Sequence, residues 1–155
     1  MKPALRGRRL VLIDIENMVG GAVLTDAAAV AVLREVARHA CLTAVDQVII
    51  GVSHIGMLPV GLALPTARLL VRSGPNGADL ELLTVLREER IAERFNELVL
   101  VSGDGIFTET VAELGAAGVS VTVVGREGCI STRLRLAASH TTIVPALAGP
   151  LGGVA

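Results

Sequence analysis

Four side chains suited to metal and phosphate chemistry stand just after apolar runs of this sequence or at the start of a helix-like pattern. Asp14 ends the first such run, and Asn17 follows it by three positions. Asp104 comes directly after the run LVLVSG, with a glycine on each side of it. Asp79 opens a helix-like pattern after the turn signal SGPNG. Open α/β sheets bind ligands at the carboxyl ends of their strands, so these residue types stand where a site is expected.

Carboxylates that converge on one crevice repel one another, and their pKa values rise unless a cation lies between them. Hard oxygen ligands suit Mg²⁺ or Mn²⁺, which keep several waters and accept phosphate oxygens. Such an ion can hold a phosphodiester, lower the pKa of a bound water and stabilise a leaving oxygen. Each acid alone has an ordinary explanation, a turn for Asp104 or a helix dipole for Asp79. Their joint placement predicts a metal site, in which Asn17 could orient water or phosphate.

Buried strands and amphipathic helices alternate along the chain. Strands are expected at 8–15, 45–52, 67–72, 97–102 and 119–124, with an edge strand at 141–144 left open. Helices are expected at 25–39, 54–66, 78–95, 106–117 and 131–139, the second of them short and imperfect. This alternation predicts an α/β fold with a parallel sheet. The strand order does not follow from the pattern. If the first and fourth strands are neighbours, Asp14 and Asp104 face one crevice, with Asp79 approaching from a helix start.

Composition limits the class of protein. The 155 residues, 52% hydrophobic, fit one domain, which we expect at 1–147 with a loose tail at 148–155. A net charge of -1 excludes a global positive field as the means of nucleic-acid binding. Cys41 and Cys129 show neither metal-ligand nor disulfide spacing, and no apolar stretch is long enough for a membrane span. We therefore expect a cytoplasmic protein that binds no membrane.

The basic residues are 13 arginines and one lysine, Lys2. Phosphatases of the haloacid dehalogenase type and phosphate-receiver domains need a lysine inside the fold, so both are excluded. Arg72 and Arg126, each at a strand end, are candidates for contact with phosphate, and Arg133 and Arg135 are weaker ones. The Ala-rich first helix and the segment 55–64 could bury a homodimer interface, although they could equally cover the sheet.

Three motifs in this order resemble the NYN domain family of the PIN-like ribonuclease superfamily. They are DIEN at 14–17, GAD at 77–79, and VSGDGIF at 101–107 followed by LGAAGVSVTVVG. The resemblance spans about 10–144. It implies a single-domain, PIN-like (Rossmann-like) three-layer sandwich with a parallel five-stranded sheet ordered 3-2-1-4-5. It also implies metal-dependent cleavage of RNA, single-stranded or structured.

The resemblance also implies roles for single residues. Asp14, Asp79 and Asp104 match the metal-site acids, with Mg²⁺ or Mn²⁺ as cofactor. Asn17 matches the paired asparagine, which would serve catalysis and substrate binding, and Ser102 matches the motif serine, a substrate-binding residue.

The chain departs from the family pattern at two positions. Ile106 stands where the family has a second aspartate, and Val85 stands where it has a second acid in the preceding helix. Glu109 or Glu16 could replace the acid that is missing at position 106, and the sequence leaves the choice between them open. The second hypothesis is therefore a non-catalytic PIN-like module that binds RNA or a protein partner.

Overall fold

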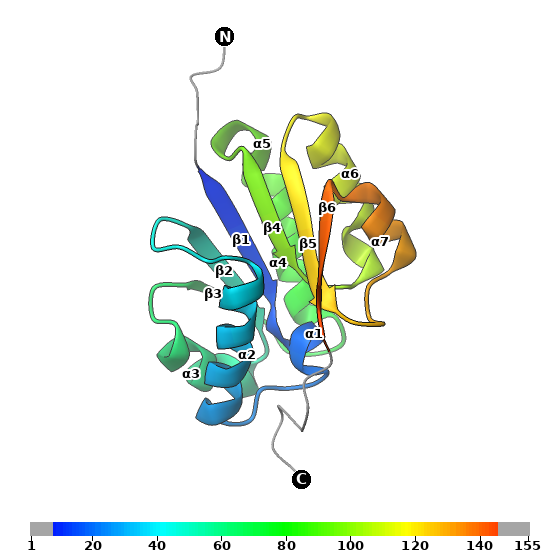
Figure 1. Ribbon diagram of the computed structural model, residues 1–155. Helices are drawn as coiled ribbons and strands as arrows, with labels where there is room; N and C mark the ends of the chain where they lie inside the picture. The colour runs from blue at the N-terminus through cyan, green and yellow to red at the C-terminus, as the bar shows by residue number, and fades with distance from the viewer. Residues whose placement is uncertain (1–7, 146–155) are drawn as a thin grey trace.

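The computed structural model describes residues 8–145, which form a six-stranded, fully parallel sheet with the order β3-β2-β1-β4-β5-β6 (Figure 1). The strands are β1 (Arg9–Asp14), β2 (Gln47–Val52), β3 (Arg68–Val71), β4 (Glu97–Val101), β5 (Ser120–Arg126) and β6 (His140–Val144). The order 3-2-1-4-5 is confirmed, but the prediction of five strands is wrong. β6 pairs in parallel with β5 at the sheet edge. Only Val144 of β6 is buried, so its sequence lacks the apolar run typical of a central strand.

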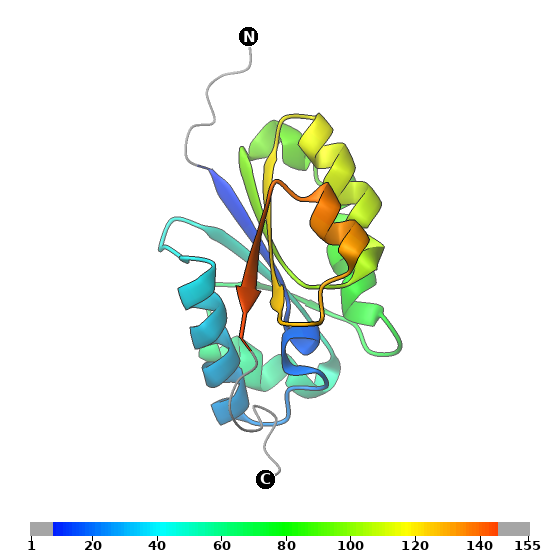
Figure 2. The ribbon, with the colours of Figure 1, turned by 45° about the vertical axis from the view of Figure 1, so that its right-hand side comes forward.

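Helices cover both faces of the sheet, as Figures 1 and 2 show, so the three-layer arrangement is confirmed. The helices are α1 (Ile15–Val19), α2 (Asp26–His39), α3 (His54–Ala63), α4 (Gly77–Glu88), α5 (Ile91–Arg94), the 3₁₀ turn η1 (Gly105–Phe107), α6 (Thr108–Ala116) and α7 (Thr132–Ala137). The first three lie on one face of the sheet and the others on the opposite face.

Alternating strand residues build two cores. Leu10 and Leu12 of β1 pack against the side of α4, α6 and α7, whereas Val11 and Ile13 face α1, α2 and α3. All four are at most 1% exposed. Burial on both faces explains the continuous apolar runs in the sequence. It also rigidly fixes the strand ends, from which the polar side chains project.

Three details differ from the expected helices. The helix expected at 78–95 is two helices, because Arg90 has a left-handed φ of 55° between α4 and α5. Val30, expected on the buried face of α2, is 43% exposed. The helix expected from Ile106 starts with the 3₁₀ turn η1. The start of α2 is as expected, since Thr25 Oγ1 accepts a hydrogen bond from Ala28 N–H at 3.1 Å.

The tail expected at 148–155, and with it the domain boundary at 147, lies outside the described residues. Within residues 8–145, none of the helices has the length and apolar character needed to cross a membrane.

Candidate active site at the carboxyl edge of the sheet

The predicted site residues come from segments that meet beside the carboxyl ends of β1 and β4. These two strands are neighbours in register, with Ile13 opposite Val101. A cavity of about 240 Å³ opens at this edge. It is lined by Asp14, Glu16, Asn17, Ser53, Arg72, Gly74, Asn76, Gly77, Ala78, Asp79 and Asp104. The three aspartates named from the sequence therefore border one cavity, together with Asn17 and Arg72.

Ser102 joins the ends of β1 and β4. Its Oγ donates to Asp14 Oδ2 at 3.0 Å and accepts from the backbone N–H of Asp104 at 3.2 Å. Ser102 is fully buried and does not line the cavity. Its hydroxyl donates and accepts within the protein and positions the two aspartates. Its contact with substrate stays a prediction.

Asn17 makes a second connection between the same strand ends. Its Oδ1 accepts from Gly103 N–H at 3.0 Å, and its backbone oxygen accepts from Arg126 Nε at 3.0 Å. Since the oxygen of the amide is engaged, Asn17 has its NH₂ group available as a donor. Arg126 is half-buried and lies outside the cavity lining. Its established contact is with Asn17.

Asp79 reaches the cavity from the first turn of α4, where it is 9% exposed. The helix can start here because Gly77 lets the backbone pass Arg72: a Cβ on Gly77 would lie 2.8 Å from the Arg72 carbonyl oxygen. Burial raises the pKa of Asp79 to about 8, and hydrogen bonding to and repulsion from Asp14 and Asp104 add to the shift. Burial also raises the pKa of Asp14. Burial and the neighbouring carboxyls therefore favour the neutral form of Asp79 over a further negative charge at this site.

The donor atoms suit a hard divalent cation, although the side chains are not already arranged around one. Four carboxyl groups, from Asp14, Glu16, Asp79 and Asp104, and one guanidinium line the cavity. Such oxygen-rich, acidic surroundings are those that Mg²⁺ and Mn²⁺ prefer. Within residues 8–145, however, no three His, Cys, Asp or Glu side chains are spaced to hold a metal as they stand. The carboxyl groups of Asp14 and Asp104 lie close enough to that of Asp79 to raise its pKa.

Neither of the two positions that depart from the family pattern lines the cavity. Ile106 is half-buried and packs against the core beneath α4, α6 and α7, while its N–H donates to Asp104 Oδ1 at 3.0 Å. Val85 is 4% exposed. Glu109 is exposed on α6 and does not line the cavity, whereas Glu16 does. The weaker candidates Arg133 and Arg135, on α7, are exposed and outside the lining.

Two polar side chains of the lining were not singled out from the sequence as site residues. Ser53 directly follows β2, and its N–H donates to Glu16 Oε1 at 2.6 Å. Asn76 precedes α4 with a left-handed φ of 56°. Ser53 could have been found, because β2 neighbours β1 and its carboxyl end must lie at the same edge. Asn76 could be predicted only as part of a turn.

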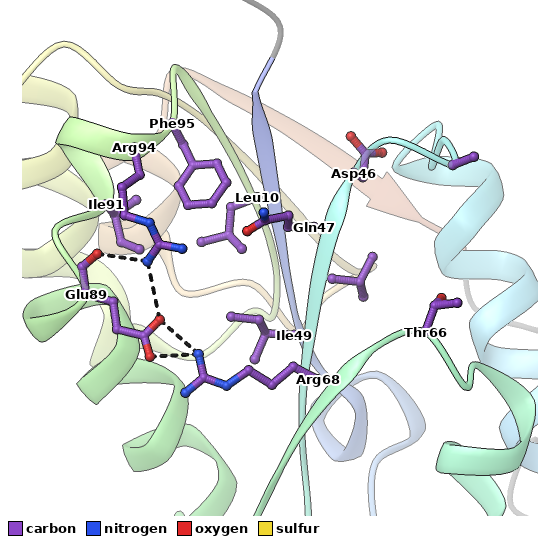
Figure 3. A pocket seen from close by; sticks show the side chains of 12 residues that line it. Leu10, Asp46, Gln47, Ile49, Thr66, Arg68, Glu89, Ile91, Arg94 and Phe95 are labelled. Atoms are coloured by element: carbon purple, nitrogen blue, oxygen red, sulfur yellow. Dashed lines mark hydrogen bonds and ion pairs between the residues drawn. The ribbon is translucent and has the colours of Figure 1, made fainter. Parts of the chain in front are cut away.

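A larger cavity, of about 570 Å³, lies at the opposite edge of the sheet and is less suited to chemistry (Figure 3). Its two labelled arginines converge on one carboxylate: Arg68 Nη1 lies 2.7 Å from Glu89 Oε1, and Arg94 Nη1 lies 3.6 Å from Glu89 Oε2. Arg94 also lies over the ring of Phe95, 5.2 Å from its centroid. These contacts hold α5 against the sheet. The cavity also lies at the amino ends of the strands, whereas open α/β sheets bind ligands at the carboxyl ends. The smaller cavity is therefore the candidate site.

Ser102→Ala is expected to lower the free energy of unfolding by about 1–3 kcal/mol, because the buried carboxyl of Asp14 and the part-buried N–H of Asp104 each lose a hydrogen bond. Urea denaturation measures the change. Ser120→Ala, at an exposed position, is the matched control and should change stability by less than about 0.5 kcal/mol. Equal stability of the two variants would contradict the bridging role of Ser102.

The comparisons with known proteins agree with this fold. The sequence profile of the NYN domain matches residues 8–145. A crystal structure of a protein of unknown function from Vibrio parahaemolyticus RIMD 2210633 is similar, with a TM-score of 0.57 and 17% sequence identity, over 93% of this chain and 96% of that one. At this identity the likeness concerns the fold alone. No curated protein matches the sequence. Because the profile covers nearly the whole chain, this protein belongs to the NYN domain family.

Proposed function

We propose that this protein is a divalent-metal-dependent endoribonuclease. The observation that carries the proposal is the meeting of Asp14, Asp79 and Asp104, from three separate segments, on one cavity at the carboxyl edge of the sheet. Membership of the NYN family, whose fold is nuclease-like, supports it. The raised pKa of Asp79 supports it too, because the site carries more negative charge than it can hold without a proton or a cation.

Asp14, Asp79 and Asp104 would hold the Mg²⁺ or Mn²⁺. An ion bound there supplies charge stabilisation for a phosphodiester and lowers the pKa of a bound water. Ser102 fixes Asp14 and the backbone of Asp104, so two of the acids need little rearrangement. Asp79 must release its proton, and its place at the start of α4 keeps the carboxylate aimed at the other two.

Two further side chains would bind the RNA backbone. Asn17 would donate its NH₂ group to phosphate or water, since Gly103 N–H holds the amide oxygen. Arg72 lines the cavity, and its guanidinium is half-exposed and only loosely paired with Glu81, at 3.3 Å. It can therefore turn towards a phosphate. We expect Arg126 to act mainly by holding Asn17 and the outer edge of the site.

The test uses the purified protein with end-labelled RNA, one strand unpaired and one folded as a hairpin. We expect internal cleavage with Mn²⁺ or Mg²⁺, none after chelation, and recovery when the ion is added back in excess. Asp104→Asn should abolish the cleavage while the protein stays folded, which separates this activity from a contaminating nuclease. Cleavage that survives both chelator and Asp104→Asn would contradict the proposal. RNA binding without any cleavage in the presence of either ion would favour the non-catalytic module.

A further inference from the structure

Glu16 is a fourth acid on the candidate site. It occupies the first turn of α1, the short helix that begins directly after β1. This places it two residues beyond Asp14, on the same cavity as the three aspartates. Among residues 8–145, Glu16 has no ion-pair partner, although Arg72 lines the same cavity and pairs instead with Glu81. Glu16 is half-buried on this acidic cavity.

The protein holds this carboxylate in one position. Ser53 N–H donates to Glu16 Oε1 at 2.6 Å, a hydrogen bond of the short, charge-assisted kind. Glu16 Oε2 makes no hydrogen bond to the rest of residues 8–145, so one oxygen is anchored and the other is available. Beside it, Ser53 Oγ is buried and has no hydrogen-bond partner among the described residues. Buried hydroxyls are normally paired, so this one points to a polar ligand or its water in the cavity.

Neither position 106 nor Glu109 supplies a carboxylate to this cavity. Ile106 packs against the core on the side of α6 and α7 and lies outside the cavity lining. Glu109 is exposed on α6 and lies outside the cavity lining. Of the two acids that the sequence left open as substitutes, only Glu16 borders the site.

We propose that Glu16 completes the metal-ligand set of this site in place of the family aspartate that Ile106 replaces, with Ser53 N–H as the group that positions it. This inference rests on the proposed metal-dependent function and adds to it a ligand from α1. The acid lost after β4 is thereby compensated after β1, on the other side of the same cavity.

The test measures Mn²⁺ alone, without RNA, by calorimetry and by the loss of the free Mn²⁺ signal in electron paramagnetic resonance. Glu16→Gln keeps the size of the side chain and the contact with Ser53 N–H but removes the charge. We expect it to weaken Mn²⁺ binding about 10-fold to 100-fold. Glu109→Gln is the matched control and should bind Mn²⁺ as the wild type does, within about twofold. Asp79→Asn serves as the reference for loss of the site itself.

The outcomes separate the inference from the function on which it rests. Weakened binding in Glu16→Gln with unchanged binding in Glu109→Gln supports the inference. Wild-type affinity in Glu16→Gln, together with lost binding in Asp79→Asn, overturns the role of Glu16 and leaves the proposed function standing. Absence of Mn²⁺ binding in the wild type itself overturns both.

Discussion

The variant Asp79→Asn is expected to be more stable than the wild type at pH 9 in metal-free buffer, and inactive as a nuclease. In the wild type, Asp79 lies against Asp14 and Asp104 in a largely buried position. Above pH 8 it must ionise there, whereas an asparagine of almost the same shape stays neutral. The removed repulsion explains the gain in stability, and the removed ligand explains the loss of activity. Stability given up at a functional site is a common compromise.

The direction of the pH dependence follows from the pKa. The raised pKa lets the folded protein keep the proton of Asp79 up to about pH 8, while the unfolded chain releases it near 3.8, the ordinary pKa of an aspartate. The folded state thus binds more protons between these values, so its stability falls as pH rises from about 4 through 8. One proton gives a slope of at most about 1.4 kcal/mol per pH unit. The stabilisation from this proton is complete below the lower value and lost above the upper one.

Urea denaturation from pH 5 to 9 with a chelator measures this dependence. The wild type should lose stability across the range, and Asp79→Asn should lose less. Asp26→Asn is the matched control, because Asp26 also lies in the first turn of a helix but is exposed. It reports any helix-dipole effect, usually below about 1 kcal/mol, without the repulsion. Parallel curves for the wild type and Asp79→Asn would show that the proton on Asp79 does not matter to stability.

The convergence of the acids could be predicted because it depends on local rules. Asp14 and Asp104 follow continuous apolar runs, and all strands of a parallel sheet end at one edge. Asp79 follows a glycine-containing turn and begins the buried stripe of α4. Given neighbouring strands β1 and β4, these positions meet without further information. The order of the strands came from the family resemblance, not from the pattern.

Other features depend on contacts between distant segments and leave no local signal. The break at Arg90 falls inside a pattern that suits one long helix, and no glycine or proline marks it. The family resemblance implied that Ser102 binds substrate, whereas its buried hydrogen bond to Asp14, 88 positions away, has no signal in the local sequence. The anchoring of Glu16 likewise requires Ser53, which lies 37 positions later in the sequence, beyond the long helix α2. The residue types were enough to predict the kind of chemistry at the site. Contacts between distant segments decide which side-chain oxygens and N–H groups are free to take part in it.

Gly103 is the position where such a distant contact is tightest, and Gly103→Ala is expected to destabilise the protein by more than about 3 kcal/mol. A Cβ there would overlap the carbonyl oxygen of Cys129, which is backbone and cannot rotate away. The crossing segment is also held by Ser131 N–H, which donates to Gly103 O at 2.8 Å.

The damage from Gly103→Ala should reach the site, because Gly103 N–H is the group that fixes Asn17 Oδ1. Urea denaturation gives the change in stability, and Mn²⁺ calorimetry on the folded fraction gives the change in the site. Gly21→Ala is the matched control: it has no atom within 4 Å of the added Cβ, and it should be neutral or more stable by up to about 1 kcal/mol. If Gly103→Ala were as stable as Gly21→Ala, the segment around Cys129 would have to move aside at little cost. The close approach of Gly103 to Cys129 would then not be what fixes the backbone after β4.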